Sequence, residues 1–247
     1  MAPTSRFEAE GMAQGYRMVA GVDEAGRGPW AGPVVAAAVV FQGRRIPRGL
    51  DDSKKLTAMA REVAYGKIMA RALVGIGIAD VATIDRINIL QATLQAMRDA
   101  IRALPCLPDL ALVDGNRAPE LDCAVRTMVE GDALSVSVAA ASIIAKVTRD
   151  RIMCALEETC PGYDFRQNKG YGTPEHRAAL ERLGVSPHHR LSFAPVAERA
   201  ARGDQLVLAL ADEPIPWFAI DDGLPHRSSD DTPLRDAAMA RSGQSTT

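Results

Sequence analysis

Runs of apolar residues in the first half of the chain predict the strands of a sheet. Residues 18–23 (MVAGVD) and 33–41 (PVVAAAVVF) are apolar stretches of strand length. Residues 73–81 (LVGIGIADV) combine β-branched residues with alternating glycines, a pattern typical of a strand that another backbone or a ligand approaches closely. Residues 110–115 (LALVDG) predict a fourth strand, and residues 124–132 (AVRTMVEGD) predict a fifth.

A helical repeat of apolar positions predicts the helices. Over residues 84–104 the apolar side chains recur every three or four positions, and a proline then ends the segment. Residues 135–158 are rich in alanine, follow the same repeat and end before a Pro-Gly pair. A third helix is predicted over residues 173–184, where Thr followed by Pro supplies an N-cap and a first helical residue. A shorter helix is expected to begin near Ser192.

The length and composition of the chain predict one folded domain. The chain has 247 residues, of which 47% are hydrophobic, enough for one substantial core. We expect a flexible segment over residues 1–16, the folded domain over residues 17–202, and an acidic, largely disordered tail over residues 203–247. No apolar run approaches the ~20 residues that span a bilayer, and the amino terminus lacks the pattern of a secretory signal. A cytoplasmic protein without membrane contact is therefore expected.

Charge and cysteine usage narrow the class of protein. The formal net charge is −2, yet the tail holds eight acidic residues and three arginines, which leaves residues 1–202 with 26 basic and 23 acidic residues. Such a mild excess favours nucleic-acid binding only if the basic side chains gather on one face. The four cysteines form no CxxC pair, which argues against a disulfide framework and against a zinc site.

Acidic side chains stand at, or just after, the ends of three predicted strands. They are Asp23 with Glu24, Asp114, and Asp132. Ligands gather at strand ends in an open sheet, so these carboxylates are able to converge. Converging carboxylates repel one another unless a cation lies between them, and Mg²⁺ or Mn²⁺ prefers oxygen ligands of this kind. Taken singly, each Asp is equally typical of a turn or a helix cap.

The chain resembles the ribonuclease HII family from about residue 17 to residue 200. The resemblance rests on six motifs that occur in order: VAGVDEAGRGPWAGPVVAAAVV, DDSKKL, LVDGNR, EGDALSVSVAAASIIAKVTRDR, NKGYGTPEH and SPHHRLSF. It implies an α/β protein with a ribonuclease H-like fold, in which helices flank a central mixed β-sheet and a small helical region lies at the carboxy-terminal end. It also implies an endoribonuclease that hydrolyses the RNA strand of RNA/DNA hybrids and cuts 5′ of ribonucleotides embedded in duplex DNA, leaving 3′-hydroxyl and 5′-phosphate ends.

The resemblance also implies a metal site. Asp23, Glu24, Asp114 and Asp132 are expected to be the catalytic, metal-binding residues. Two divalent ions, Mn²⁺ or Mg²⁺, would act during catalysis, with Asp23 between them. The implied partner is nucleic acid, and the protein is expected to be a monomer. The sequence does not tell whether it contacts a replication clamp.

Five further residues are expected to bind substrate. By resemblance, Gly26, Arg27 and Gly28 sense the 2′-hydroxyl that distinguishes RNA from DNA. Tyr171 is expected to stack on the deoxynucleotide that follows the ribonucleotide, and Lys54 to contact a phosphate. On their own, the GRG residues also fit a simple turn, the tyrosine a core position, and the lysine a solvated turn.

Two positions depart from the family pattern. Trp30 stands where a smaller or aliphatic residue is usual, and Glu130 where Lys or Gly is usual. Because Glu130 adds a negative charge close to Asp132, we predict stronger local repulsion and a stronger dependence on bound metal. The histidines at 176, 188 and 189 are expected to have structural or surface roles rather than to act as bases.

Three other functions fit parts of this pattern. Another nuclease, recombinase or resolvase of the same fold would share the acidic strand ends, but the GRG and KGYG motifs favour a protein that reads ribose. A kinase of the actin-like type would need phosphate-binding loops that the sequence lacks. A nucleic-acid-binding module without catalytic activity would not require acids at three separate strand ends.

Overall fold

Five strands form one mixed sheet, in the order β3-β2-β1-β4-β5, in this computed structural model, which describes residues 2–43 and 46–202. The strands are β1 (Val19–Ala25), β2 (Val34–Phe41), β3 (Ala72–Ala79), β4 (Leu110–Asp114) and β5 (Ala124–Met128). Strand β2 pairs antiparallel with both β1 and β3, whereas β4 pairs parallel with both β1 and β5. All five predicted strands are present, and the predicted mixed α/β sheet is confirmed.

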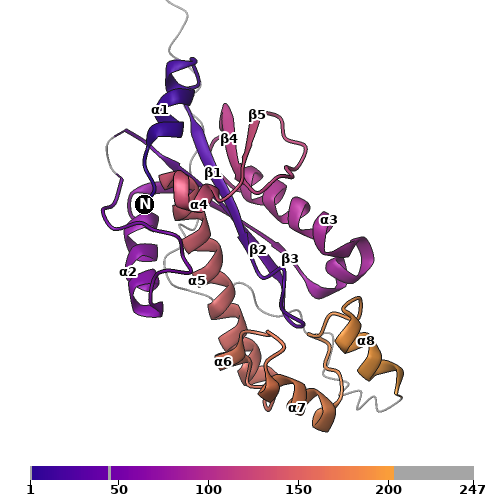
Figure 1. Cartoon of the computed structure of the whole chain (residues 1–247). Helices are drawn as coiled ribbons and strands as arrows, with labels where there is room; N and C mark the ends of the chain where they lie inside the picture. The colour runs from indigo at the N-terminus through magenta and orange to yellow at the C-terminus, as the bar shows by residue number, and fades with distance from the viewer. Residues whose placement is uncertain (1, 44–45, 203–247) are drawn as a thin grey trace, which may run out of the picture. The chain divides into compact units, whose positions relative to one another are not determined.

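Helices cover both faces of this sheet (Figure 1). They are α1 (Arg6–Ala13), α2 (Ala58–Met69), α3 (Val81–Arg102), α4 (Gly131–Leu134), α5 (Val136–Thr159), α6 (Phe165–Asn168), α7 (Pro174–Leu183) and α8 (Ala194–Ala201). Helix α3 packs on β1, β2 and β3, while α5 packs on β1 and β2, with α2 against α5. No helix in the described part of the chain is long and apolar enough to cross a membrane.

The central strand β2 is buried on both sides, as its continuous apolar run predicts. Ala36 and Ala38 belong to the core beneath α3, whereas Ala37 and Val39 belong to the core beneath α5. Because side chains alternate along a strand, these two cores lie on opposite faces of the sheet. Strand β2 is therefore held between the two long helices.

The alternating glycines of β3 allow α3 to approach closely. A β-carbon on Gly75 would lie 2.1 Å from the carbonyl oxygen of Ala100, and one on Gly77 would lie 2.0 Å from that of Ala96. The alternating glycines predicted a close approach by another backbone or a ligand, and the structure shows that the backbone of α3 makes this approach. This helix begins three residues earlier than predicted and is broken at Asn88, which has φ 67°. The Asn88 side chain accepts hydrogen bonds from two amides of the next turn, so it caps the second part of the helix.

The amino-terminal segment differs from the predicted flexible segment over residues 1–16. Residues Arg6–Ala13 form α1, and the Glu8 side chain on it is buried. Helix α2 was also not predicted, since it buries only Ala64, Tyr65 and Ile68 and its apolar positions follow no clear helical repeat. The predicted tail over residues 203–247 lies outside the described residues.

A cluster of buried rings ties the carboxy-terminal helices together. His176 and His189 are both buried, and their Nε2 atoms are 3.0 Å apart. His176 Nδ1 donates to the Tyr171 carbonyl, and the Ser186 amide donates to His189 Nδ1. One neutral tautomer of each ring satisfies all three hydrogen bonds, with His189 donating to His176. The expected structural role is confirmed for these two histidines.

We expect acid to weaken the fold at this histidine pair. Burial and the neighbouring histidines lower the pKa of His189 from 6.5 to about 3. Because the folded pKa lies below the unfolded one, the stabilisation is complete above about pH 6.5 and is lost as the pH falls toward 3. At pH 5 the expected loss in the free energy of unfolding is about 2 kcal/mol. Urea unfolding at pH 7 and pH 5 measures it, with His189→Asn as the comparison. If His189→Asn lost as much free energy of unfolding between pH 7 and pH 5 as wild type, groups other than His189 would cause the loss.

Candidate active site

The carboxylates of β1 and β4 meet because the two strands are parallel neighbours. Val22 pairs with Val113, so the next residues, Asp23 and Asp114, lie side by side at the carboxyl ends of the strands. Asp23 is buried, and Glu24 and Asp114 are half-buried. Burial is the largest cause that raises the pKa of Asp23 and of Glu24, and the charge of the neighbouring Asp114 raises both further.

Asp132 reaches the same place through a short turn after β5. The strand ends at Met128, and Glu130 adopts a left-handed conformation, with φ 58°, before the single turn of α4. The Gly131 amide donates to Asp114 Oδ1 over 2.7 Å, which ties the start of α4 to the end of β4. Burial of Asp132 in this turn raises its pKa, and the charge of Asp114 raises it further. The structure therefore brings all four predicted carboxylates together.

Negative charge is in excess at this group of acids. Burial is the largest cause of the raised pKa of Asp23, followed by the charges of Glu24 and Asp114. Burial likewise raises the pKa of Glu24 and of Asp132. The positive charges nearby are partial compensation: Arg27 lies 3.4 Å from Glu24, and the Lys54 ammonium lies 3.8 Å from Asp132.

This donor set fits a hard divalent cation. All its ligand atoms are carboxylate oxygens, and a cation between them would relieve the repulsion between these negative charges. Within residues 2–43 and 46–202, no three His, Cys, Asp or Glu side chains already stand at coordination spacing. The acids thus form a loose group, and their chemistry rather than a preformed cage favours Mg²⁺ or Mn²⁺.

A fifth acid, Asp52, lies next to this group and was not predicted. After burial, its charge is the next cause of the raised pKa of Asp132. Glu130 is exposed, and its predicted effect on the dependence on metal stays a prediction. Asp52 Oδ1 also accepts from the Lys54 amide over 2.9 Å, which shapes the turn that carries this lysine. Its place in the DDSKKL motif beside Lys54 was the available signal.

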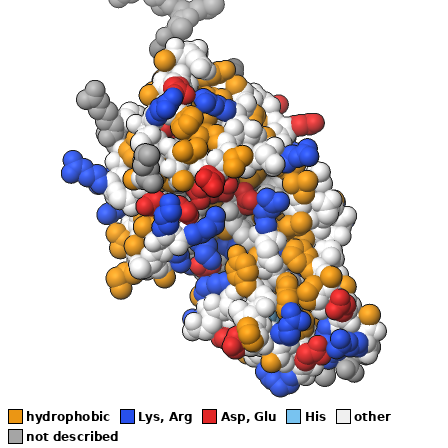
Figure 2. Space-filling model, viewed as in Figure 1, with side chains coloured by type: hydrophobic (Ala, Val, Ile, Leu, Met, Phe, Trp, Pro, Cys, Tyr) orange, Lys and Arg blue, Asp and Glu red, His pale blue; other side chains and the backbone are white. Residues whose placement is uncertain are grey.

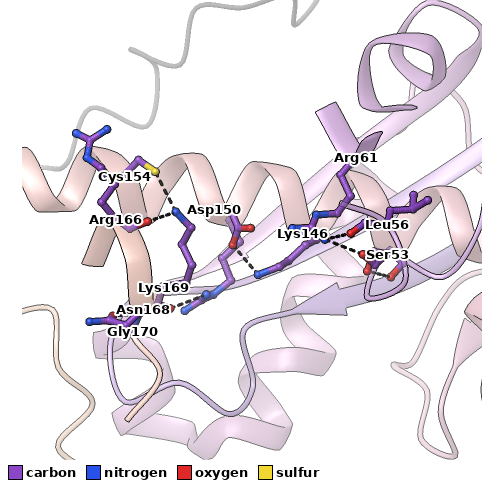
Figure 3. A network of polar contacts seen from close by, with 12 residues as sticks. Ser53, Leu56, Arg61, Lys146, Asp150, Cys154, Arg166, Asn168, Lys169 and Gly170 are labelled. Atoms are coloured by element: carbon purple, nitrogen blue, oxygen red, sulfur yellow. Dashed lines mark hydrogen bonds and ion pairs between the residues drawn. The ribbon is translucent and has the colours of Figure 1, made fainter. Parts of the chain in front are cut away.

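Arg61 fastens the Lys54 loop from α2. Its guanidinium donates to the carbonyl oxygens of Ser53, at 2.9 Å, and Leu56, at 2.7 Å (Figure 3). The Lys54 side chain is left 84% exposed. By contrast, Lys146 is paired with Asp150 at 2.7 Å in the same network. Lys54 therefore stays largely exposed to solvent while it pairs with Asp132.

Two buried arginines hold the GRG loop, by which we mean residues 26–33 between β1 and β2. The sequence analysis predicted neither arginine. Arg190 donates to the carbonyl oxygens of Gly26, Arg27, Gly32 and Pro33. Arg149 donates to those of Ala31, Pro33 and Lys169. Burial lowers the pKa of Arg149 to about 10 and that of Arg190 to about 9, so both remain charged at neutral pH. The loop is thereby held through its main-chain carbonyl oxygens, while Arg27 and Gly28 stay exposed to solvent.

Gly26 is required by this packing. It has φ +97°, and a β-carbon there would lie 2.1 Å from Nε of Arg149. Gly28 is exposed, and a β-carbon there would lie 3.6 Å from the Tyr171 ring. The Trp30 amide donates to the Gly170 carbonyl over 2.8 Å, which joins the GRG loop to the KGYG loop. The predicted substrate-binding glycines and tyrosine are therefore neighbours.

Tyr171 is available to a ligand. Its side chain is 46% exposed, which is not the core position considered as an alternative. Asn168 Oδ1 accepts from the Gly170 amide over 2.7 Å and holds the loop in shape (Figure 3). The ring of Trp30 occupies the space over Gly172, where a β-carbon would lie 2.2 Å away. A glycine at position 172 is therefore required by the packing of Trp30.

The charged side chains are not scattered evenly over this face. Figure 2 shows acidic side chains gathered near the middle of the view, with Lys and Arg side chains on several sides of them. Residues 1–202 have a mild excess of basic residues. This excess favours nucleic-acid binding only if the basic side chains gather on one face. The face in view thus carries an acidic patch with basic side chains around it.

Comparisons with known proteins agree with this arrangement. Residues 20–196 match the ribonuclease HII family. The ribonuclease HII of Bradyrhizobium sp. strain BTAi1 is 54% identical over 212 residues, which cover 86% of this chain and 73% of the relative. The ribonuclease HII of Parvibaculum lavamentivorans is 56% identical over 202 residues, which cover 81% of this chain and 75% of the relative.

A solved structure has the same fold. The crystal structure of ribonuclease H2 from Pyrococcus horikoshii matches with a TM-score of 0.64 and 28% identity, covering 75% of this chain and 98% of that one. The ribonuclease H-like fold implied by the motifs is therefore confirmed. The chain belongs to the ribonuclease HII family and is a metal-dependent endoribonuclease.

Proposed function

We propose that this chain hydrolyses the RNA strand of RNA/DNA hybrids and also cuts 5′ of single ribonucleotides embedded in duplex DNA. The products are 3′-hydroxyl and 5′-phosphate ends. Two divalent ions, Mg²⁺ or Mn²⁺, act at Asp23, Glu24, Asp114 and Asp132. All of these residues, and both substrate loops, come from one chain, which supports action as a monomer.

The observation that carries the proposal is the meeting of four acids from separate parts of the chain. Asp23 and Glu24 end β1, Asp114 ends β4, and Asp132 lies in the first turn of α4. Burial, followed by the charges of Glu24 and Asp114, raises the pKa of Asp23, and burial, followed by the charges of Asp52 and Asp114, raises the pKa of Asp132. Such an arrangement costs stability unless it binds a cation, so it supports a metal-dependent reaction.

The side chains divide the work of catalysis. The four carboxylates would hold the divalent ions, which, when bound, supply neutralisation of the scissile phosphodiester and activation of water for in-line attack. Lys54, beside Asp132, is placed to bind a phosphate of the substrate and to balance the acids. Because water is the attacking group, the reaction needs no nucleophile from the protein. The carboxylates would hold the ions, and the loops would select the substrate.

The GRG loop and Tyr171 support selection of ribose. The exposed Gly28 lets a sugar approach the main chain without a side chain between them. The neighbouring Tyr171 ring offers a flat surface for the next nucleotide. A 2′-hydroxyl is the group that a main-chain donor or acceptor can distinguish at such a place.

A DNA duplex with one ribonucleotide tests the proposed function. With Mg²⁺ or Mn²⁺, the wild-type chain is expected to cut once, on the 5′ side of the ribonucleotide, and to leave a 3′-hydroxyl. An otherwise identical all-DNA duplex is expected to stay intact. Cleavage of both duplexes at the same rate would contradict the reading of ribose.

We expect Tyr171→Ala to lower kcat/KM for the embedded ribonucleotide about 10-fold or more, since stacking contributes about 1–3 kcal/mol per base. Tyr171→Phe is the matched control, because it keeps the ring and should retain near wild-type activity. Steady-state rates on the single-ribonucleotide duplex measure the effect. Equal activity of the Ala variant and wild type would remove Tyr171 from the substrate site.

A further inference from the structure

The first residues of the chain hold the junction between α4 and α5. The Thr4 amide donates to the Leu134 carbonyl over 3.0 Å, and the Val136 amide donates to the Thr4 carbonyl over 3.2 Å. Thr4 and Ser135 therefore form a parallel β-bridge. This contact joins two segments that are about 130 residues apart in the sequence, and it lies directly behind the turn that carries Asp132.

The Glu8 side chain reinforces the same junction from α1. Its Oε1 accepts from Ser135 Oγ at 2.5 Å, Ser137 Oγ at 2.6 Å and the Ser137 amide at 3.0 Å. The side chain is buried, and its Oε2 meets no hydrogen-bond donor among the described residues. Burying a carboxylate costs stability, and here the buried carboxylate of Glu8 serves only to bind two serines to α1. The cost indicates that the position of this junction matters.

Asp132 lies between two anchors. The front anchor is the 2.7 Å bond from the Gly131 amide to Asp114, and the rear anchor is the set of bonds from Thr4 and Glu8. Helix α4 is only Gly131–Leu134, so a shift at its end moves Asp132 directly. The close seat of Gly21 against the start of α5 leaves that helix little room to absorb such a shift, since a β-carbon there would lie 2.1 Å from its backbone.

We propose that Glu8 is a positioning residue for the metal-binding acids: it fixes the α4–α5 junction and thereby the place of Asp132 relative to Asp114. The inference rests on the proposed function, because it assumes that Asp132 holds metal. It assigns the amino-terminal helix a part in catalysis, although α1 lies outside the residues that match the family. Groups that orient metal ligands typically contribute 10- to 100-fold in metal affinity or activity.

The test compares Glu8→Ala with Glu10→Gln, a control on the same helix whose exposed carboxylate pairs with Arg6 and Arg126. Mn²⁺ affinity is measured by calorimetry, and kcat and KM for a hybrid are measured at a temperature where unfolding curves show every variant folded. For Glu8→Ala we expect Mn²⁺ binding and kcat each to fall about 10-fold, with KM for the hybrid nearly unchanged. Glu10→Gln is expected to match wild type.

Two further variants make the outcome decisive. Ser137→Ala removes one of the bonds to Glu8 and should weaken Mn²⁺ binding a few-fold even if Glu8→Ala does not fold. Wild-type Mn²⁺ affinity and kcat in a folded Glu8→Ala, or in Ser137→Ala, would overturn the inference. Asp132→Asn separates the two claims, since Mn²⁺ binding unchanged in that variant would contradict the proposed function itself.

Discussion

Asp23→Asn is expected to lower the rate of hybrid cleavage at least about 10³-fold and to leave the protein folded, with stability at pH 7 equal to or above that of wild type. We expect the rate to fall because Asp23 is the proposed central ligand of the divalent ions, and such ions contribute several kcal/mol to phosphodiester hydrolysis. Stability behaves oppositely because burial and the charges of Glu24 and Asp114 raise the pKa of Asp23. An acid with a raised folded pKa destabilises the fold when ionised, and Asn removes that charge at nearly constant size.

Single-turnover cleavage with Mg²⁺ and urea unfolding at pH 7 measure the two effects of Asp23→Asn. Asp122→Asn is the control, since Asp122 is an exposed acid outside the site. The control should change neither the rate nor the free energy of unfolding by much. If Asp23→Asn cleaved within 10-fold of wild type, Asp23 would not be a metal ligand. A marked loss of stability would show that its charge is compensated in the folded protein.

Arg190→Met is expected to lower the free energy of unfolding by about 3–5 kcal/mol and to impair cleavage as well. The Arg190 guanidinium is buried and donates to four carbonyl oxygens of the GRG loop. Methionine fills a similar volume but leaves those carbonyls without donors, and each unsatisfied buried group costs about 1–3 kcal/mol. The loop that should read ribose would also lose its fixed position.

Arg166→Met is the matched control for this prediction. Arg166 is exposed and pairs with Glu158 at the surface, so its loss should cost less than about 1 kcal/mol. Urea unfolding of the two variants gives the comparison directly. A cost for Arg190→Met as small as that for Arg166→Met would mean that the loop is held by other contacts.

Much of the site could be predicted because its geometry is local to each strand. An apolar run followed by an acid marks a strand and the residue at its end, as in the segments ending at Asp23 and Asp114. Strand pairing then places these ends together. The prediction of Asp132 depended more on the family motif than on the pattern of an apolar run followed by an acid, because Asp132 lies beyond the end of β5, in α4.

The supporting groups could not be predicted, because long-range main-chain contacts define them. Arg149 and Arg190 are charged residues of a kind usually found at the surface, and their partners are carbonyl oxygens that no sequence pattern marks. Glu8 likewise has partners about 130 residues away in the sequence. The break at Asn88 was hidden because the apolar repeat continues through it.

The most direct test of the account is anomalous diffraction from crystals of the wild-type protein grown with Mn²⁺ and an uncleavable hybrid. The account predicts manganese peaks within coordination distance of Asp23, Glu24, Asp114 and Asp132, beside the phosphate of a ribonucleotide. Manganese bound elsewhere, with these four carboxylates free of metal in the substrate complex, would contradict it.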